Sequence, residues 1–263
     1  MPPGGRHALV VMSLQDRAAE LARLRSLPAL VPAETALFDP PFRLMDGPSF
    51  VPQYEEIFIN EIYSFPFDGS RPVIIDCGAN IGLGILWWRS RWRNARIIAF
   101  EPDPEVFETL QFNLRYHEGL ELHQAAVGDV DGSQLFYPQG SDAGRLDHRV
   151  AGSASELPVE VRSLGTVLEQ VDSVDLLKID IEGTETAALV AAAPRLSKAR
   201  RIFVEYHSFP DEPQRFGELL ELLRQSGYRY YCETPMTIVR PFHGVPLNQG
   251  IDLQVNVFAW RAP

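Results

Sequence analysis

Hydrophobic and polar positions follow one regular pattern after Pro72 and a less regular one before it. Short apolar runs, such as "PVIIDCGA", "ARIIAFEP", "VDLLKIDIEG" and "RRIFVEYHSF", alternate with segments of helical spacing, such as "DPEVFETLQFNLRYHEG". Runs that are apolar on both faces predict strands of a parallel sheet that helices cover on both sides. The last two runs, "YRYYCE" and "DLQVNVFAW", have no helix between them and should pair antiparallel at one edge. The predicted fold is a doubly wound α/β sheet.

The less regular first part predicts an N-terminal helical extension at 1–70, followed by a sheet domain at 71–263. Ser13 and Asp16 form a capping box that opens the first helix of the extension. The expected inner face of this helix consists of Leu14, Ala18 and Leu21. The six prolines of segment 28–52 should exclude regular structure there. A second helix is expected in "QYEEIFINEIYSF".

Composition and charge narrow the class of protein. The 263 residues are 45% hydrophobic, which is enough for a full core, and the net charge is −11. This charge argues against nucleic acid and anionic membranes as partners. No apolar run reaches the roughly 20 residues of a spanning helix, and "ALVVM" is too short for a signal peptide. Cys77 and Cys232 suggest neither a disulfide framework nor a metal site. A cytoplasmic protein is expected, and its assembly state stays open, a homodimer included.

The stretch "VIIDCGANIG" carries the first candidate chemistry. Asp76 ends an apolar run, where a carboxylate is costly without partners, and Gly78 and Gly82 allow backbone to approach a ligand closely. Glu101 ends the next strand, where an acid can accept hydrogen bonds from ribose hydroxyls. An adenosine-containing cofactor is therefore implied. The dinucleotide fingerprint G-x-G-x-x-G and a Tyr-x-x-x-Lys pair are both absent, yet a nicotinamide- or nucleotide-dependent oxidoreductase stays open as the alternative.

Five ordered motifs, "VIIDCGANIG", "AFEPDPEVFETLQFNL", "AAVGDVDG", "DLLKIDIEGTE" and "FVEYH", resemble the FkbM family of class I S-adenosylmethionine-dependent methyltransferases. The resemblance covers roughly residues 53–208 and implies a mostly parallel seven-stranded sheet with the order 3-2-1-4-5-7-6. It also implies a cofactor loop of Asp76, Gly78, Asn80 and Gly82, a ribose clamp at Glu101, and adenine contacts from Pro102, Asp103 and Asp129. Asp103 has an alternative role as a helix N-cap, and Asp129 as an ordinary turn residue.

Two pairs of polar residues are candidates for the chemistry. Asp180 and Glu182 are two residues apart after one strand, and Glu205 and His207 are two apart in the next, so each pair points to one side. We expect them to converge and to take the proton of a hydroxyl acceptor. A histidine base would titrate near about 6.5. Asp180 and Glu205 could instead hold Mg²⁺ or Mn²⁺. The alternative is a purely structural role: Asp180 and Glu182 would then cap the following helix, and His207 would be a hydrogen-bonded histidine at the edge of the sheet.

The acceptor is the least determined part of this interpretation. The resemblance implies O-methylation of a small molecule: a sugar, a nucleotide-sugar, a polysaccharide unit or a natural product. The helix "QYEEIFINEIYSF" should form a lid over the cofactor, with Tyr63 reaching the acceptor. Two loops carry the basic residues Arg145, His148, Arg149, Arg240 and His243. They hint at an anionic acceptor, although solvated loop charge is the simpler explanation. A non-catalytic cofactor-binding module is a third hypothesis.

Overall fold

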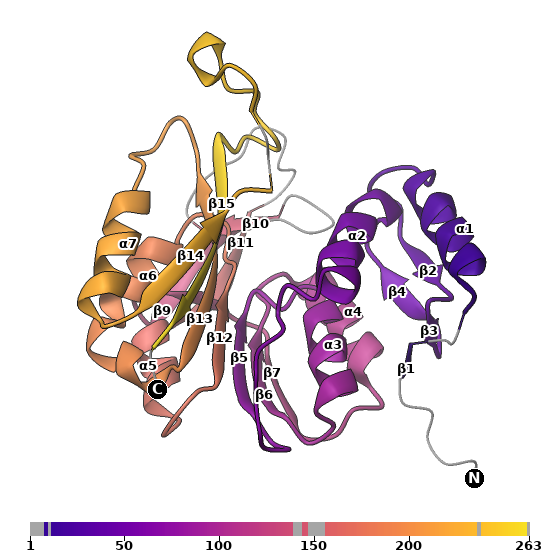
Figure 1. Cartoon of the computed structure of the whole chain (residues 1–263), viewed down its shortest axis with the longest axis horizontal. Helices are drawn as coiled ribbons and strands as arrows, with labels where there is room; N and C mark the ends of the chain where they lie inside the picture. The colour runs from indigo at the N-terminus through magenta and orange to yellow at the C-terminus, as the bar shows by residue number, and fades with distance from the viewer. Residues whose placement is uncertain (1–7, 10–11, 139–143, 147–155, 236–237, 262–263) are drawn as a thin grey trace.

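A seven-stranded sheet forms the centre of the molecule (Figure 1). The computed structural model describes residues 8–9, 12–138, 144–146, 156–235 and 238–261. Neighbouring strands lie in the order β14-β15-β13-β12-β5-β6-β7, which is 3-2-1-4-5-7-6 when they are numbered along the chain. The strands are β5 (Val73–Cys77), β6 (Arg96–Phe100), β7 (Leu120–His123), β12 (Leu176–Ile179), β13 (Arg201–Ser208), β14 (Arg229–Glu233) and β15 (Leu253–Trp260). Neighbouring strands pair in parallel from β13 through β12, β5 and β6 to β7. β15 runs antiparallel to both β13 and β14, as the sequence predicts for the last two strands.

Helices cover both faces of this sheet, which confirms the doubly wound arrangement (Figure 1). On one side lie α3 (Leu83–Arg91) and α4 (Pro104–Leu114). On the other side lie α5 (Leu164–Glu169), α6 (Glu185–Ala191), the short 3-10 helix η2 (Ala193–Lys198) and α7 (Phe216–Gln225). Neighbouring residues of β5 enter different cores: Ile74 packs with α3 and α4, and Ile75 with α5 to α7. Because β5 is buried on both faces, its side chains are apolar on both faces until its last residues.

The N-terminal extension is less purely helical than expected. It contains α1 (Leu14–Arg25), α2 (Gly47–Tyr54) and a π-helical turn η1 (Glu55–Ile59). Two small sheets pair β1 (Ala8–Leu9) with β3 (Phe38–Asp39) and β2 (Ala33–Thr35) with β4 (Phe42–Leu44). The proline-rich segment thus does hold regular structure: Pro40 and Pro41 separate β3 from β4, Pro48 lies in the first turn of α2, and Pro52 lies inside that helix. The expected second helix starts six residues earlier and ends at Ile59, so Tyr63 lies beyond it.

The first helix confirms its capping box and corrects its inner face. The Ser13 side chain accepts a hydrogen bond from the Asp16 backbone N–H at 3.1 Å. Leu21 and Leu24 are buried as the inner residues, whereas Leu14 is 81% exposed and Ala18 is exposed. The helix therefore packs through its second half only.

The extension shares its core with α3 and α4. Phe38, Phe42, Phe50 and Tyr54 form an aromatic cluster that belongs to the same buried group as Trp88. A polar link adds to this packing, because the Asn113 side chain of α4 bonds both the N–H and the carbonyl of Arg43. The extension is consequently part of one folded body.

A second, four-stranded sheet follows β7 in the chain. Its order is β10-β9-β11-β8, with β8 (Ala126–Gly128), β9 (Gly132–Pro138), β10 (Gly144–Leu146) and β11 (Leu157–Ser163). The neighbouring strands β7 and β8 therefore belong to different sheets, β7 to the central one and β8 to the second one. The connection between β14 and β15 extends away from the body and contains the short 3-10 helix η3 (Pro241–His243) (Figure 1). Among the described residues, each helix is too short or too polar to cross a lipid bilayer.

Candidate active site

The loop after β5 brings backbone close to the end of β12. Gly78 has a φ of +88°, and a Cβ at this position would lie 1.9 Å from the Asp180 carbonyl oxygen. No residue with a side chain fits here without moving the backbone. Asn80 also has a positive φ of 48°, and its side chain accepts a hydrogen bond from the Ile81 N–H at 2.6 Å. Gly82, with a φ of +91°, starts α3, and a Cβ there would meet the Leu110 side chain at 2.8 Å.

A narrow groove runs from this loop across the end of β6. Its wall is formed by Gly78, Asn80, Phe100, Glu101, Pro102, Asp103, Val106, Ala125, Ala126, Val127, Phe136, Gly144, Leu146, Asp180, Ile181 and Glu182. One end is largely apolar and the other is rich in carboxylates. Of the sequence-predicted cofactor residues, Gly78, Asn80, Glu101, Pro102 and Asp103 line the groove. Asp76, Gly82 and Asp129 do not: Asp76 faces the neighbouring cavity, Gly82 shapes the helix start, and Asp129 is exposed.

Glu101 is tied to the surrounding backbone through both carboxylate oxygens. Oε2 accepts from the Asn80 N–H at 2.9 Å, and Oε1 accepts from the Asp103 N–H at 3.0 Å. Burial nevertheless raises the pKa of Glu101 to about 7. Each oxygen has a second lone pair, which leaves room for hydroxyl donors in the groove. Asp103 combines both predicted roles, because it lines the groove and caps α4 through the N–H groups of Glu105 and Val106.

Lys178 organises the acids that surround it, and the sequence analysis did not identify it. Its ammonium lies 3.2 Å from Asp76 Oδ1 and 3.3 Å from Asp180 Oδ2, and donates to the Gly78 carbonyl at 2.6 Å. Although burial alone would lower the pKa of Lys178, the two carboxylates raise it well above its usual value. A lysine inside the apolar run "VDLLKID" was the available signal, since a buried charge requires a partner.

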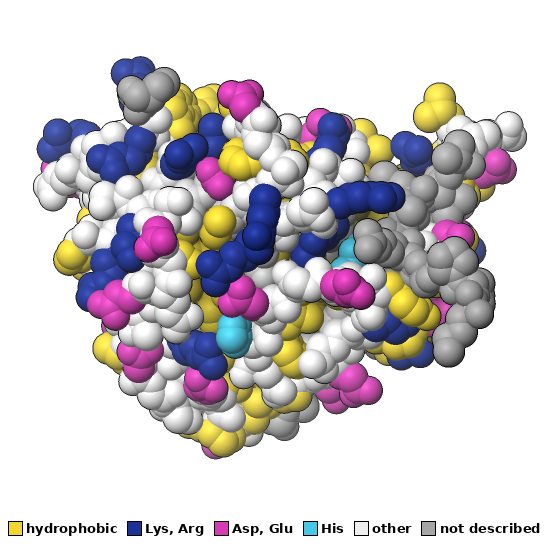
Figure 2. Space-filling model, turned by 90° about the horizontal axis from the view of Figure 1, so that it is seen from below, with side chains coloured by type: hydrophobic (Ala, Val, Ile, Leu, Met, Phe, Trp, Pro, Cys, Tyr) yellow, Lys and Arg dark blue, Asp and Glu magenta, His cyan; other side chains and the backbone are white. Residues whose placement is uncertain are grey.

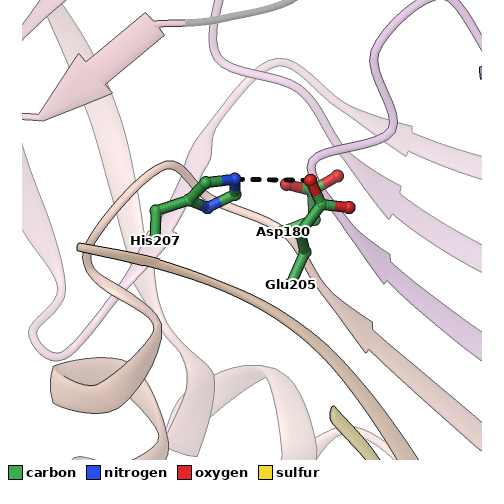
Figure 3. A group of neighbouring side chains, drawn as sticks. All are labelled: Asp180, Glu205 and His207. Carbon is green, nitrogen blue, oxygen red and sulfur yellow. Dashed lines mark ion pairs between the residues drawn. The ribbon is translucent and has the colours of Figure 1, made fainter. Parts of the chain in front are cut away.

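Asp180, Glu205 and His207 converge at the ends of β12 and β13, as predicted (Figure 3). One ligand atom from each lies within 4.8 Å of the others. His207 Nε2 is 3.3 Å from Glu205 Oε1 and 3.9 Å from Glu182 Oε2. The side chains of Asp180 and Glu205 are 25% and 17% exposed, whereas that of His207 is 2% exposed. These two carboxylates, together with that of Glu182 at 20%, therefore form the accessible surface, and the imidazole lies behind them.

Protonation in this cluster differs from the sequence-based expectation. Burial alone would lower the pKa of His207, but Glu182, Glu185 and Glu205 raise it well above 6.5. A histidine that titrates near its ordinary value is therefore not what this environment provides. Burial also raises the pKa of Glu205, and it raises that of Glu182 to about 8. The cluster consequently retains protons around neutral pH.

A larger cavity of about 530 Å³ adjoins the groove and shares Gly78, Asn80, Asp180 and Glu182 with it. Its floor contains Tyr63, which was predicted to reach this region. Segment α2–η1 covers this cavity and contributes no residue to the groove, so the predicted lid lies over the cavity instead of the cofactor side. The cavity is lined by Pro48, Ser49, Pro52, Gln53, Glu56, Ile57, Tyr63, Asp76, Gly78, Ala79, Asn80, Leu83, Gly84, Lys178, Asp180, Glu182, Glu205, His207, Pro235, Asn248, Gln249, Ile251 and Gln254.

Glu56 is a cavity residue that the sequence analysis missed. It lies on the π-helical turn η1 and lines the cavity. Burial, together with Glu205 and Asp180, raises its pKa to about 7. A π-helical turn inside a helix often marks a functional position, which was not visible in the amino-acid pattern.

The predicted basic acceptor residues do not line this cavity. Arg145 is 4% exposed, pairs with Glu212 and stacks on Phe209 at 3.4 Å, so it supports the turn after β12. Arg240 and His243 are exposed on the β14–β15 connection, and His148 and Arg149 lie outside the described residues. Other arginines, Arg200, Arg201 and Arg261, line an apolar groove at the opposite end of the sheet. Figure 2 shows Lys and Arg side chains on that lower side, interspersed with Asp and Glu side chains.

A model of the FkbM methyltransferase domain matches residues 76–230. The chain belongs to this family. Methyltransferase 1 of Beauveria bassiana is 33% identical over 163 residues, which cover 52% of this chain and 64% of that protein. The AMB antimetabolite synthetase AmbE of Pseudomonas aeruginosa is 29% identical over 80% of this chain, which corresponds to 12% of its own length. The chain thus spans less than two thirds of each of these two relatives.

Two further FkbM comparisons concern a named enzyme and a solved structure. The 31-O-demethyl-FK506 methyltransferase FkbM of Streptomyces tacrolimicus is 26% identical over 219 residues, covering 68% of this chain and 82% of that enzyme. The crystal structure of a methyltransferase FkbM from Methylobacillus flagellatus KT aligns with a TM-score of 0.51 at 19% identity. It covers 78% of this chain and 47% of that one, and supports the fold. Family membership favours a methyltransferase over the nicotinamide-dependent alternative.

Proposed function

We propose that this chain transfers the methyl group of S-adenosylmethionine to a hydroxyl of an uncharged, polyhydroxylated small molecule. One observation carries the proposal: the narrow groove and the large cavity meet at Gly78, Asn80, Asp180 and Glu182, which line both. At that junction the carboxylates of Asp180 and Glu205 reach the surface. A donor in the groove and an acceptor in the cavity would therefore meet beside groups that can take a proton.

The groove fits S-adenosylmethionine in shape and chemistry. Its apolar part, around Phe100, Val106 and Leu146, suits adenine, and the spare lone pairs of Glu101 suit two ribose hydroxyls. Gly78 lines both the groove and the cavity, so the chain that links sugar and sulfur would pass beside it. Bound there, the cofactor supplies a methyl group already activated on a positively charged sulfur. The carboxylates at the junction favour that positive charge.

Proton removal is assigned to Asp180 and Glu205, because the pKa of the third partly exposed carboxylate, Glu182, is raised to about 8. When the acceptor oxygen forms its bond to the methyl carbon and the carbon–sulfur bond breaks, the hydroxyl proton must leave the oxygen. Asp180 or Glu205 accepts this proton, and His207 holds Glu205 from behind at 3.3 Å. General-base help of this kind is typically worth about 10²–10⁴-fold in rate. S-adenosylhomocysteine and the methyl ether are the products.

Activation of the acceptor hydroxyl by a divalent cation is the second candidate mechanism. The same three residues, Asp180, Glu205 and His207, also suit such an ion. Two carboxylates and one imidazole within 4.8 Å of one another form a donor set that Mn²⁺ or Mg²⁺ accepts. Such an ion would orient the acceptor hydroxyl and lower its pKa. Loss of turnover in EDTA and its recovery with Mn²⁺ would favour this route, whereas turnover that resists EDTA would favour the carboxylate base.

The chemistry of the cavity wall supports an uncharged acceptor. Neutral hydrogen-bonding side chains come from Ser49, Gln53, Asn248, Gln249 and Gln254. They stand beside five acids, Glu56, Asp76, Asp180, Glu182 and Glu205, and no arginine is among the described lining residues. The basic lining groups, Lys178 and His207, are already paired with these acids. Hydroxyl groups can donate to the carboxylates and amides, whereas a phosphate would find no unpaired cation among the described lining residues. A relative's name agrees with O-methylation: NoeI of Sinorhizobium fredii, 26% identical over 51% of this chain, is a 2-O-methyltransferase.

Two measurements test the proposal. Calorimetric titration should detect S-adenosylhomocysteine binding and no NAD binding. With [methyl-¹⁴C]S-adenosylmethionine, a panel of methyl glycosides and alditols should yield labelled ethers, and the phosphorylated forms of the same sugars should not. Binding of NAD without S-adenosylhomocysteine would overturn the methyltransferase assignment. A preference for the phosphorylated sugars would overturn the acceptor assignment alone.

A further inference from the structure

Glu185 is a fully buried carboxylate directly behind the catalytic cluster. It is the first residue of α6 and has 0% exposed surface. Its Oε1 lies 3.1 Å from His207 Nδ1 and accepts the Gly183 N–H at 2.8 Å. Its Oε2 is buried without a hydrogen-bond partner among the described residues. A carboxylate in such surroundings is costly, so its retention calls for a specific role.

A continuous line of contacts leads from Glu185 to the cavity. His207 contacts Glu185 through Nδ1 at 3.1 Å and Glu205 through Nε2 at 3.3 Å. Glu205 reaches the cavity wall and also accepts a hydrogen bond from the Gln254 side chain. Figure 3 shows the His207 ring directed at the Glu205 and Asp180 carboxylates. With a carboxylate at each ring nitrogen, both nitrogens are placed as donors.

We propose that Glu185 is a positioning residue for methyl transfer, acting through His207 to hold the Glu205 carboxylate in place at the acceptor cavity. The inference rests on the proposed function. The Nδ1 contact with Glu185 at 3.1 Å sets the orientation of the ring, because a hydrogen bond to a carboxylate is stronger than one to a neutral group. Donation from Nε2 then fixes Glu205, whose remaining lone pairs face the acceptor. Partners of this kind behind a reacting group typically change activity by about 10–100-fold when they are replaced.

A purely structural role is the alternative, because Glu185 also closes the turn at Gly183. Glu185→Gln separates the two roles. The amide oxygen of glutamine can still accept the Gly183 N–H, and the side-chain volume is nearly unchanged. The contact with His207 Nδ1 changes from a hydrogen bond with a charged carboxylate to a weaker one with a neutral amide. Asp175→Asn is the matched control, since Asp175 is also buried and accepts a backbone N–H, from Val73 at 2.9 Å, at the far end of β12.

The primary readout is the ¹⁵N spectrum of His207 at pH 7. The unaltered protein and Asp175→Asn should show the same Nδ1 shift, and Glu185→Gln should show a different one, because its hydrogen bond at Nδ1 is weaker. The second readout is turnover with the methyl glycoside that reacts fastest with the unaltered protein. In Glu185→Gln, kcat should fall about 10–100-fold, with the KM for S-adenosylmethionine within twofold.

The possible outcomes separate the two proposals. Unchanged His207 nitrogen shifts and unchanged kcat in Glu185→Gln would overturn the positioning role, as would a lowered melting temperature with unchanged shifts. If the unaltered protein methylates no glycoside, the proposed acceptor class fails. In that case the nitrogen shifts still decide whether Glu185 controls His207, because they need no substrate.

Discussion

Gly78 is the residue at which backbone geometry most directly determines the site. A side chain would require a φ of +88° and would collide with the Asp180 carbonyl oxygen at 1.9 Å. We predict that Gly78→Ala destabilises the fold by more than the roughly 1–2 kcal/mol of a left-handed residue and abolishes S-adenosylhomocysteine binding. Thermal unfolding and calorimetry measure both effects. Gly217→Ala is the control, because nothing lies within 4 Å of that position; wild-type-like binding in both variants would contradict the prediction.

Glu101 is a second single residue with a testable effect, because its ionisation should make cofactor binding depend on pH. Its pKa is raised to about 7 by burial, and Asp103 and Lys178 also influence it. Ionised Glu101 is the better acceptor for ribose hydroxyls, so S-adenosylhomocysteine should bind more tightly as pH rises from 6 to 8. Glu101→Gln should bind more weakly and lose this pH dependence. We choose Gln over Ala because both carboxylate oxygens also hold backbone N–H groups. An equal pH slope in the variant would assign the effect to another group.

At the scale of elements, the extension behaves as part of the core. Leu24 of α1 is 0% exposed and belongs to the buried group that contains Trp88 of α3. Leu24→Ala should therefore lower the free energy of unfolding of the whole chain by about 2–5 kcal/mol in a single transition. Leu14→Ala, at a position that is 81% exposed on the same helix, should change it by less than about 0.5 kcal/mol. A separate early transition in Leu24→Ala, with the main one unchanged, would show an independently folding extension.

Helix η1 shows what this integration provides. It places Glu56 at the cavity, opposite the acids at the ends of β12 and β13. Phe50, Val51, Tyr54 and Ile57 of α2 and η1 belong to the shared core, so this wall of the cavity packs on the body of the protein.

At the scale of the whole molecule, buried acids link stability to pH. Folding raises the pKa of Glu101 to about 7 and that of Glu182 to about 8, from 4.5. Between these values the folded state binds more protons than the unfolded state, so the free energy of unfolding should decrease as pH rises from 5 to 8. Glu101 alone would account for about 3 kcal/mol. The raised pKa of His207 acts in the same direction above pH 6.5.

Urea denaturation at pH 5, 6.5 and 8 measures this dependence. The free energy of unfolding should be highest at pH 5. Glu101→Gln removes one of the titrating groups, so its stability should vary less over the same range. The lowered pKa of Glu20, to about 2, matters only below pH 4.5 and does not affect this comparison. Stability that rises steadily from pH 5 to 8 would contradict the prediction.

Local sequence determined the helices and strands of the sheet domain and much of the groove that is proposed to hold the cofactor. Apolar runs and capping residues act over a few positions, so the sheet strands, the cap of α1 by Ser13 and the cap of α4 by Asp103 could all be predicted. The meeting of Asp180, Glu205 and His207 was also predictable, because carboxyl ends of neighbouring parallel strands share one edge. Prolines were a poorer guide, since their effect depends on whether each one falls at the end of an element or inside it.

Only the tertiary structure decided which charges are partners and which residues face the acceptor. Lys178 bonds a carbonyl 100 positions away, and Glu185 meets His207 across 22 positions. Arg145 is buried against Glu212, while Glu56 reaches the cavity from the extension. The energy of a charge depends on its distance from other charges and on its exposure, and both are set by packing between distant segments. The sequence by itself therefore determined the family and the edge of the sheet at which Asp180, Glu205 and His207 meet. The tertiary structure decided which charges pair there and how deeply each one is buried.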